Sequence, residues 1–403
     1  MLRPAAPLDP IRPEARDAPT SGIVDIMTYA RGREGLIPLY VGEGDLPTPP
    51  FVLERARQGL ADGETFYTYQ RGIPELREAI ARYHERVFGG RFDPDRFTVT
   101  VGGMHAAQMA LRIVSGAGDE VLIPSPAWPN FDGVARVTGA VPIAVPLDCG
   151  PNGWTLDLGR LADAVTPRTR ALLVNTPANP TGWTASREDL AGILEIARRH
   201  GLWIVADEIY GRFVHDPAFA EQGRSPSFRD VMGEDDRVLF IQTFSKNWAM
   251  TGWRIGWLET PPELGQIVEN LVQYSTSGVP HFLQRGAVAA LDEGEEFLAD
   301  QIAKSRRGRA IVCEGLAATN VVDLPPPPAA FYAFFRVLGR PDTRALARDI
   351  VDDAAVGLAP GSAFGPGGGA HLRLCFLRDP LQLEEAVERL ARVLPRLARA
   401  EAA

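Results

Sequence analysis

The feature that most constrains the fold of this chain is an alternation of short apolar runs with helical stretches between Phe97 and Trp257. Stretches with helical spacing, such as Arg187–His200, separate runs that are bounded by Gly, Pro, Asn or Asp. The alternation predicts a mostly parallel sheet with helices on both faces, a doubly wound α/β fold. The strands that we expect are Phe97–Val101, Glu120–Ile123, Ala171–Asn175, Leu202–Ala206 and Val238–Thr243.

The sequence changes character beyond about Leu291. It predicts a long polar helix, a proline run at Pro325–Pro328, a strand at Ala330–Val337, and a strand at His371–Phe376 before a closing helix. These elements indicate a smaller α+β domain. We expect a division into residues 1–45 as an N-terminal arm and part of the small domain, 46–290 as the large domain, and 291–403 as the C-terminal small domain.

The composition is typical of a globular enzyme and disfavours nucleic-acid and membrane partners. Of the 403 residues, 45% are hydrophobic, and the formal net charge of -9 gives no cationic face for a phosphate backbone. No window approaches the roughly 20 apolar residues that span a bilayer. The segment Met1–Thr20 is rich in proline and lacks the apolar stretch of a secretory signal. We therefore expect a flexible arm there and a cytoplasmic protein.

The cysteines indicate neither a disulfide framework nor a metal site. Cys149, Cys313 and Cys375 are odd in number, far apart, and not spaced like metal ligands. We expect reduced thiols in the core and no bound metal.

Ligands of doubly wound sheets bind beyond the carboxyl ends of the strands. The polar and glycine residues that could bind a ligand follow the predicted strands at those ends: Gly102, Gly103, Trp128, Asn179, Asp207, and the segment Thr243 to Lys246. One pocket could collect them all.

Lys246 is the residue with the strongest chemical signal. Its neighbours in the sequence include Phe244, Trp248, Met250 and Trp253, an environment in which an unpaired ammonium is costly. Desolvation or nearby cations would lower the pKa of the amine and allow it to form a Schiff base. An isolated lysine would more simply be a solvated surface charge, but these neighbours favour a functional amine.

The segment that contains Lys246 resembles the lysine segment of class I pyridoxal-phosphate aminotransferases of fold type I. The matching residues are Ser245-Lys246-Asn247 and Gly252-Trp253-Arg254-Ile255-Gly256. Further family motifs appear in order along the chain: Gly42 to Pro49, Tyr67 with Gly72 to Arg77, Asn179 to Gly182, Asp207 to Tyr210, and Arg373 to Phe376. The resemblance implies a large domain with a mostly parallel seven-stranded sheet plus a smaller α+β domain, and pyridoxal 5′-phosphate as the cofactor.

The resemblance implies three catalytic residues. Lys246 would carry the cofactor as a Schiff base and move the substrate's α-proton. Asp207 would keep the pyridine nitrogen protonated, so that the ring acts as an electron sink. Tyr210 would contact the phenolic oxygen of the cofactor. By the residues alone, Asp207 could instead cap a helix.

Further residues are implied to hold the ring and its phosphate. Asn179 would donate to the phenolic oxygen and lie at the substrate, although Asn-Pro-Thr-Gly is also a turn signature. Trp128 would stack on the ring, with core packing as the alternative. The implied phosphate cradle consists of Gly102, Gly103, Met104, Thr243, Ser245 and Arg254. Met104 departs from the polar residue of many relatives and offers only its backbone N–H.

The resemblance also implies a shared active site and a substrate clamp. Tyr67 would reach the phosphate of the partner subunit, which implies a homodimer. Arg373 would bind the substrate α-carboxylate with two parallel hydrogen bonds, with the backbone of Gly42 close by. A buried structural salt bridge is the alternative for Arg373.

The implied reaction is a ping-pong transfer of an amino group from an L-amino acid to a 2-oxo acid. The same scaffold also supports β-elimination or C–S lyase chemistry, α,γ-elimination and amino-acid oxidation, because the fold does not dictate which bond breaks. A cofactor-sensing regulator would need a DNA-binding module, for which the N-terminal arm has no room. The resemblance implies glutamate or aspartate as the amino donor. The preferred side chain stays open: neither the cations Arg31, Arg71 and Arg285 nor the aromatics Phe331, Tyr332 and Phe335 decide it.

Overall fold

The computed structural model describes residues 11–399, and its centre is a mixed sheet of eight strands. Neighbouring strands from β8 through β7, β6 and β3 to β4 pair in parallel, while β9 runs antiparallel to both β8 and β2. All five predicted strands are confirmed, with ends shifted by up to two residues. In spatial order the strands are β2 (Phe97–Thr100), β9 (Gly256–Glu259), β8 (Val238–Thr243), β7 (Trp203–Asp207), β6 (Thr169–Asn175), β3 (Glu120–Ser125), β4 (Val141–Gly150) and β5 (Gly153–Leu156).

The expected α/β fold is confirmed, and the sheet has one more strand than the seven that we expected. Strand β5 extends the sheet because it forms an antiparallel hairpin with the last residues of β4. The sequence pattern missed β4 because it contains Pro142 and Pro146, which cannot donate to a sheet ladder. The structure accommodates both prolines because this part of β4 pairs with β3 on one side only. Strand β9 was hidden within the motif around Arg254.

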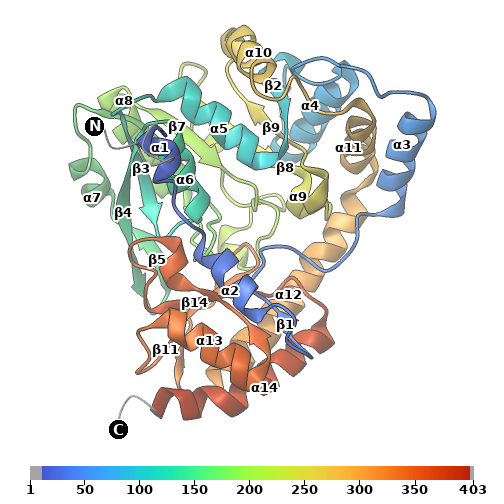
Figure 1. Ribbon diagram of the computed structural model, residues 1–403. Helices are drawn as coiled ribbons and strands as arrows, with labels where there is room; N and C mark the ends of the chain where they lie inside the picture. Colours follow the sequence, from blue (N-terminus) through green and yellow to red (C-terminus); the bar gives the residue numbers. More distant parts are fainter. Residues whose placement is uncertain (1–10, 400–403) are drawn as a thin grey trace, which may run out of the picture.

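Helices cover the sheet on both faces (Figure 1). Helix α8 (Arg187–His200) has the predicted bounds because local signals agree at both ends. Ser186 and Asp189 form a capping box at its start, and Gly201 ends it with a φ of 66°. Helix α5 (Gly102–Val114) begins at the glycine pair Gly102–Gly103. The other helices of this layer are α6 (Pro129–Val137), α7 (Leu158–Asp163), α9 (Phe244–Asn247) and α10 (Gly265–Gln273).

A second apolar core lies beside β2 and β9. It is enclosed by α3 (Pro50–Ala61), α4 (Pro74–Phe88) and α11 (His281–Glu293), which pack on one another. Trp248 and Trp257 are its largest buried side chains. This core supports the short helix α9 that carries Lys246.

The C-terminal part of the chain forms a smaller sheet, drawn in orange and red in Figure 1. Its strand order is β10 (Val322–Asp323), β11 (Tyr332–Val337), β14 (His371–Cys375) and β13 (Ala359–Pro360). The two strands predicted here therefore exist and pair antiparallel. The helices around this sheet are α12 (Glu295–Ala317), α13 (Thr343–Ala354) and α14 (Pro380–Arg399).

The N-terminal segment joins this smaller sheet. Strand β1 (Ile37–Pro38) pairs in parallel with β12 (Val356–Gly357), and α2 (Gly22–Ala30) packs on α13 and β13. The arm expected at Met1–Thr20 lies outside the described residues up to position 10. Beyond that point it contains the one-turn helix α1 (Pro13–Arg16).

Candidate active site

The site is built at the carboxyl ends of three adjacent parallel strands, as the sequence predicts for this class of sheet. Asn175 at the end of β6 lies directly beside Asp207 at the end of β7. Asp207 in turn lies beside Ile241 of β8, and this strand ends two residues later at Thr243. Lys246 follows within α9. The sheet therefore brings together polar residues that are up to 71 positions apart in the sequence, from 175 to 246.

Asp207 is a buried carboxyl group without an ion-pair partner in residues 11–399; its exposed fraction is 2%. Its Oδ1 accepts hydrogen bonds from Asn175 Nδ2 at 3.1 Å and from the backbone N–H of Ile209 at 3.4 Å. Burial raises the pKa of Asp207 to about 7, and these hydrogen bonds oppose the rise. No helix follows directly, so the alternative of a helix cap is wrong. A cation beside this carboxyl group would favour its ionised form.

Lys246 presents a partly buried amine to the same space. Its Nζ donates to the backbone oxygen of Gly42 at 2.7 Å and has no carboxylate within ion-pair distance among the described residues. Desolvation lowers the pKa of Lys246 to about 8, and the guanidinium groups of Arg373 and Arg254 contribute to the shift. About a tenth of the amine is therefore neutral and nucleophilic at pH 7, far more than for a solvated lysine.

Two buried tyrosines line the site next to Gly42. The hydroxyl groups of Tyr210 and Tyr332 form a hydrogen bond at 2.8 Å, and Tyr332 Oη donates to Gly42 O at 3.4 Å. Burial raises the pKa of both phenols, so both are neutral at physiological pH. A Cβ at position 42 would lie 2.4 Å from Tyr332 Oη, so the position requires glycine.

We expect Gly42→Ala to destabilise the protein by about 1–3 kcal/mol, the usual cost of overpacking a rigid core. The added methyl group would collide with the hydroxyl group of Tyr332, a fully buried side chain. Thermal unfolding measures the effect, with Gly369→Ala as the control because a Cβ there meets nothing within 4 Å. The double variant Gly42→Ala/Tyr332→Phe should recover part of the loss. A Gly42→Ala protein as stable as the control would contradict this packing.

Arg373 is a buried guanidinium with no carboxylate partner among the described residues. Its exposed fraction is 2%. Nη1 donates to Asn179 Oδ1 at 3.0 Å, Nη2 donates to Tyr40 O, and the guanidinium carbon lies 4.8 Å from the ring centroid of Tyr332. Nε has no hydrogen-bond partner. The alternative of a structural salt bridge is therefore wrong, and the charge is available for an anionic ligand.

Asn179 and Asn175 connect the acid with this guanidinium. Asn175 Oδ1 accepts the backbone N–H of Asn179 at 2.8 Å, while the Asn175 amide donates to Asp207. The Asn179–Pro180 peptide bond is cis, and Gly182 has a φ of 71°, so the predicted turn is also present. Asn175 thereby sets the position of both Asp207 and Asn179.

The residues of the implied phosphate cradle gather at the start of α5. Gly102 has a φ of 70°, and a Cβ there would lie 2.5 Å from Arg254 Nη2. A Cβ on Gly103 would lie 3.6 Å from Thr243 Cβ. Thr243 caps α9 through the backbone N–H of Ser245. The helix terminus and one guanidinium therefore meet at one place, which suits an anion.

Three predicted residues lie at the border of this site or outside it. Trp128 is half-buried and packs edge-on against Phe131 with 5.4 Å between ring centroids. The Met104 sulfur accepts the Asn130 amide at 3.3 Å. Tyr67 is 96% exposed and does not join the site within one subunit.

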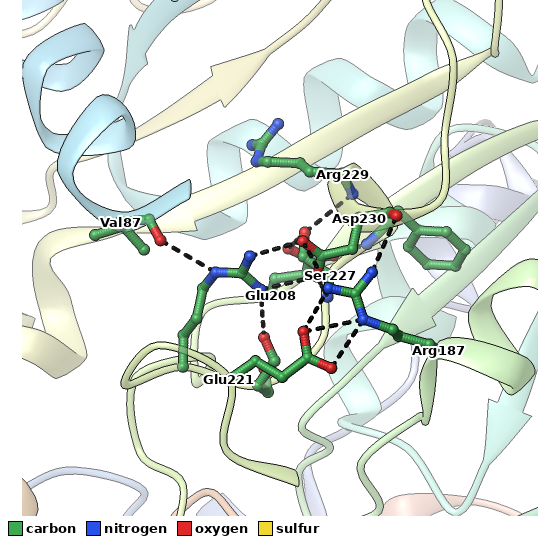
Figure 2. Close-up of polar contacts among 10 residues, drawn as sticks. Val87, Arg187, Glu208, Glu221, Ser227, Arg229 and Asp230 are labelled. Carbon is green, nitrogen blue, oxygen red and sulfur yellow. Dashed lines mark hydrogen bonds and ion pairs between the residues drawn. The ribbon is translucent and has the colours of Figure 1, made fainter. Parts of the chain in front are cut away.

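Glu208, which follows Asp207, belongs to a separate network of polar contacts (Figure 2). Glu208, the neighbour of Asp207, accepts from Ser227 Oγ at 2.6 Å and from the backbone N–H of Phe228 at 3.0 Å. Burial raises the pKa of Glu208, while Arg229 opposes the rise. Arg229 itself forms an ion pair with Glu259. Glu208 is therefore held by structural partners and does not share the environment of Asp207.

The sequence missed Asn175 and did not decide the role of Tyr332. Asn175 had a usable signal, since it ends a predicted strand just as Asp207 does. Tyr332 had none, because only the tertiary fold places its hydroxyl group against Tyr210 and Gly42. Phe331 packs on Tyr210 and Phe213 in the core.

Other classes of site are not found in the part of the chain that the structure describes. Residues 11–399 contain no group of three or more side chains that could hold a metal ion, and none of their helices is long and apolar enough to cross a membrane. The three cysteines are free. Cys375 is buried, whereas Cys149 and Cys313 are only partly buried.

The fold and the site define an α/β transferase of fold type I, and comparison with known proteins gives the family. The family model for class I and II aminotransferases matches residues 34–390. This chain belongs to that family and is an aminotransferase. An aspartate aminotransferase of Rhizobium meliloti is 34% identical over 91% of this chain and 92% of its own length. Aromatic-amino-acid aminotransferase 2 of Thermococcus litoralis is 34% identical over 93% and 95%.

The solved structures agree with this assignment. The N-succinyldiaminopimelate aminotransferase of Mycobacterium tuberculosis superposes with a TM-score of 0.88 at 31% identity. The match covers 94% of this chain and 99% of the other. The family, the fold and the enzyme class inferred from the sequence are therefore confirmed.

Proposed function

We propose that this aminotransferase works with pyridoxal 5′-phosphate held between Lys246 and Asp207, and that it follows a ping-pong mechanism. The observation that carries the proposal is the pair itself. The Asp207 carboxyl group and the Lys246 amine lie near enough for the amine to influence the pKa of the carboxyl group, yet neither has an ion-pair partner within residues 11–399. Such groups are costly to bury unless a ligand satisfies them.

The residues present fit this cofactor at three points. Asp207 offers a carboxylate to a protonated ring nitrogen, and Lys246 offers a neutral amine to an aldehyde. The start of α5 with Arg254 offers N–H groups and a positive charge to a phosphate. Tyr210 and Asn179 offer polar groups for the phenolic oxygen, and half-buried Trp128 offers an aromatic face for stacking.

In the proposed mechanism each residue has one task. When bound, the cofactor draws electrons from the substrate's α-carbon and carries the amino group between the two half-reactions. Asp207 would keep a proton on the ring nitrogen, and Lys246 would take the α-proton and pass it on to the cofactor carbon. Arg373 binds the substrate carboxylate, since its guanidinium has no competing carboxylate. Asn179 holds Arg373 in place.

Cofactor capture tests the proposal directly, because the chain contains only two lysines, Lys246 and Lys304. We expect borohydride reduction of the loaded protein to fix the cofactor on Lys246. The neutral amine is the nucleophile, so the rate of capture by cofactor-free protein should rise about tenfold per pH unit below the pKa of about 8, and level off above it. Stopped-flow absorbance and peptide mass spectrometry measure both. Label on Lys304, or a rate that falls with pH, would refute the assignment.

We further propose that the enzyme is a homodimer in which Tyr67 completes the partner's phosphate cradle. Four aromatic side chains are largely exposed. Three of them lie in one loop, and the fourth follows α10, which contacts that loop. Their exposed fractions are 84% for Phe66, 96% for Tyr67, 63% for Tyr69 and 88% for Tyr274. The loop of Tyr69 contacts the end of α10 through a hydrogen bond between Gln70 and Gln273 at 2.8 Å. Such an aromatic surface is typical of a protein interface.

We expect sedimentation velocity of the wild-type protein to give twice the chain mass of 43.8 kDa. The Phe66→Ser/Tyr67→Ser variant should shift toward the mass of one chain. The control is Leu381→Ser, an equally exposed apolar side chain at the start of α14. A wild-type protein that sediments as one chain at micromolar concentration would contradict the dimer.

The domain division and the cellular location follow as proposals. The pairing of β1 with β12 and the packing of α2 on α13 support grouping residues 1–45 with residues 291–403, and 46–290 as the large domain. Three free cysteines are compatible with the reducing cytoplasm.

A further inference from the structure

We infer that the substrates of this aminotransferase carry a bulky apolar or aromatic side chain, which enters a groove beside Trp128. The inference rests on the proposed function, and it names the substrate class that the described residues favour over the glutamate or aspartate donor that the resemblance implies. Three features carry it: the groove continues from the site, its cations are already paired, and its inner end is apolar.

The groove has a volume of about 1170 Å³ and lies between α2, α6 and the loop at residues 362–366. Three of its lining residues also border the site: Met104 follows the phosphate cradle, Trp128 is the predicted ring-stacking residue, and Phe364 adjoins Arg373. The guanidinium carbon of Arg373 lies 4.9 Å from the ring centroid of Phe364. A substrate held by Arg373 therefore has the groove within reach of its side chain.

The groove offers no unpaired cation in the part of the chain that the structure describes. Its charged lining residues are two arginines and two aspartates, and they pair with one another. Arg136 donates to both carboxylate oxygens of Asp132, at 2.7 Å from Nε and 3.0 Å from Nη2. Arg344 Nη2 donates to Asp25 Oδ2 at 3.1 Å. The lining is thus electrically neutral, and a substrate carboxylate would compete with existing partners.

Two of the three arginines considered from the sequence, Arg71 and Arg285, are occupied elsewhere, and the third, Arg31, is exposed and does not line the groove. Arg285 pairs with Glu64 and Glu75, and Arg71 bonds Thr98 and the backbone oxygen of Asp95. Neither residue lines the groove. A second carboxylate on the substrate therefore has no evident partner among the residues described in one subunit.

The inner end of the groove, which we define as the part next to Met104 and Trp128, favours apolar contact. The Asn130 amide donates to the Met104 sulfur at 3.3 Å, and a thioether offers a substrate carboxylate no hydrogen-bond donor. Ser125 donates to the backbone oxygen of Pro366 at 2.8 Å. Trp128 and Met104 leave aromatic and thioether surface to the groove. Burying an apolar side chain here is favourable, whereas burying a carboxylate without a partner is costly.

The test compares amino donors in half-reactions of the cofactor-loaded wild-type enzyme, followed by absorbance. We expect kcat/KM for L-phenylalanine and L-leucine to exceed that for L-aspartate and L-glutamate by at least about tenfold, a difference within the reach of pocket discrimination. Binding provides a second measurement that needs no turnover. The unreactive 3-phenylpropanoate should bind more tightly than succinate or glutarate.

A matched pair of variants locates the preference in the groove. Asp132→Asn releases Arg136, so the ratio of kcat/KM for L-glutamate to that for L-phenylalanine should rise by about two- to fivefold, the range of exposed ion pairs. The double variant Asp132→Asn/Arg136→Gln removes the released cation and should return the ratio to the wild-type value.

The outcomes separate this inference from the function on which it rests. A wild-type enzyme that reacts readily but prefers dicarboxylates overturns the inference and leaves the proposed function intact. So does a ratio that Asp132→Asn leaves unchanged. A loaded protein that reacts with no amino donor overturns the proposed function itself.

Discussion

Lys246→Ala is expected to lower transamination by on the order of 10⁴-fold or more, because one substitution removes both the proposed anchor of the cofactor and the group proposed to move the α-proton. The amine is the only group described in the site with a pKa near 8. The structure shows no other lysine that could replace it, since Lys304 is 8% exposed and paired with Asp45 at 2.5 Å.

The measurement is single-turnover reaction of the loaded enzyme with an amino donor, together with absorbance of the bound cofactor. Lys304→Arg is the matched control: it leaves Lys246 as the one lysine of the chain and keeps the charge that pairs with Asp45. It should retain nearly full activity. A Lys246→Ala protein that turns over at the wild-type rate would remove Lys246 from the mechanism.

Asp207→Asn is expected to lower kcat by about 10²- to 10³-fold, the usual effect of removing one preorganised electrostatic group. The amide cannot hold a proton on the ring nitrogen, so the ring would draw fewer electrons from the α-carbon. The cofactor should still be fixed on Lys246 after borohydride reduction. The spectrum and the pH dependence of the bound cofactor should change, because a neutral group replaces a carboxyl group whose pKa is about 7.

The adjacent residue supplies the matched control for this substitution. Glu208 is also buried, and Glu208→Gln removes the same charge one position further along the chain. Its carboxylate faces Ser227 and the backbone of Phe228 instead of the site, so this variant should lose stability rather than catalysis (Figure 2). Equal losses of kcat in the two variants would show that Asp207 acts through the fold and not on the cofactor.

Local patterns predicted much of the fold correctly. The bounds of α8 follow from a capping box and a glycine stop, which act within a few residues and are visible in any sequence. The prolines of β4 misled the pattern, because their cost depends on whether a neighbouring strand needs their missing N–H groups. Pairing of that kind is a tertiary property.

The sequence predicted those residues of the candidate site that directly follow strands. It did not predict contacts between residues that are far apart in the sequence. Asp207, Asn179 and Lys246 all lie just beyond predicted strands, so the sheet rule finds them. The hydroxyl pair of Tyr210 and Tyr332 joins positions 122 residues apart and has no local signature. That no carboxylate among the described residues pairs with Arg373 likewise becomes known only from the folded structure, which shows all the groups around the guanidinium.

The sequence by itself determined the family, the order of the main elements and the residues that we propose to carry the chemistry, because these depend on short motifs and on hydrophobic periodicity. Only the tertiary structure decided which charges are paired. Arg136 is occupied by Asp132, whereas Arg373, Lys246 and Asp207 have no ion-pair partner among residues 11–399. The physical reason is that the energy of a charge depends on its distance to every neighbour and on its burial, and the chain fixes both only when it folds.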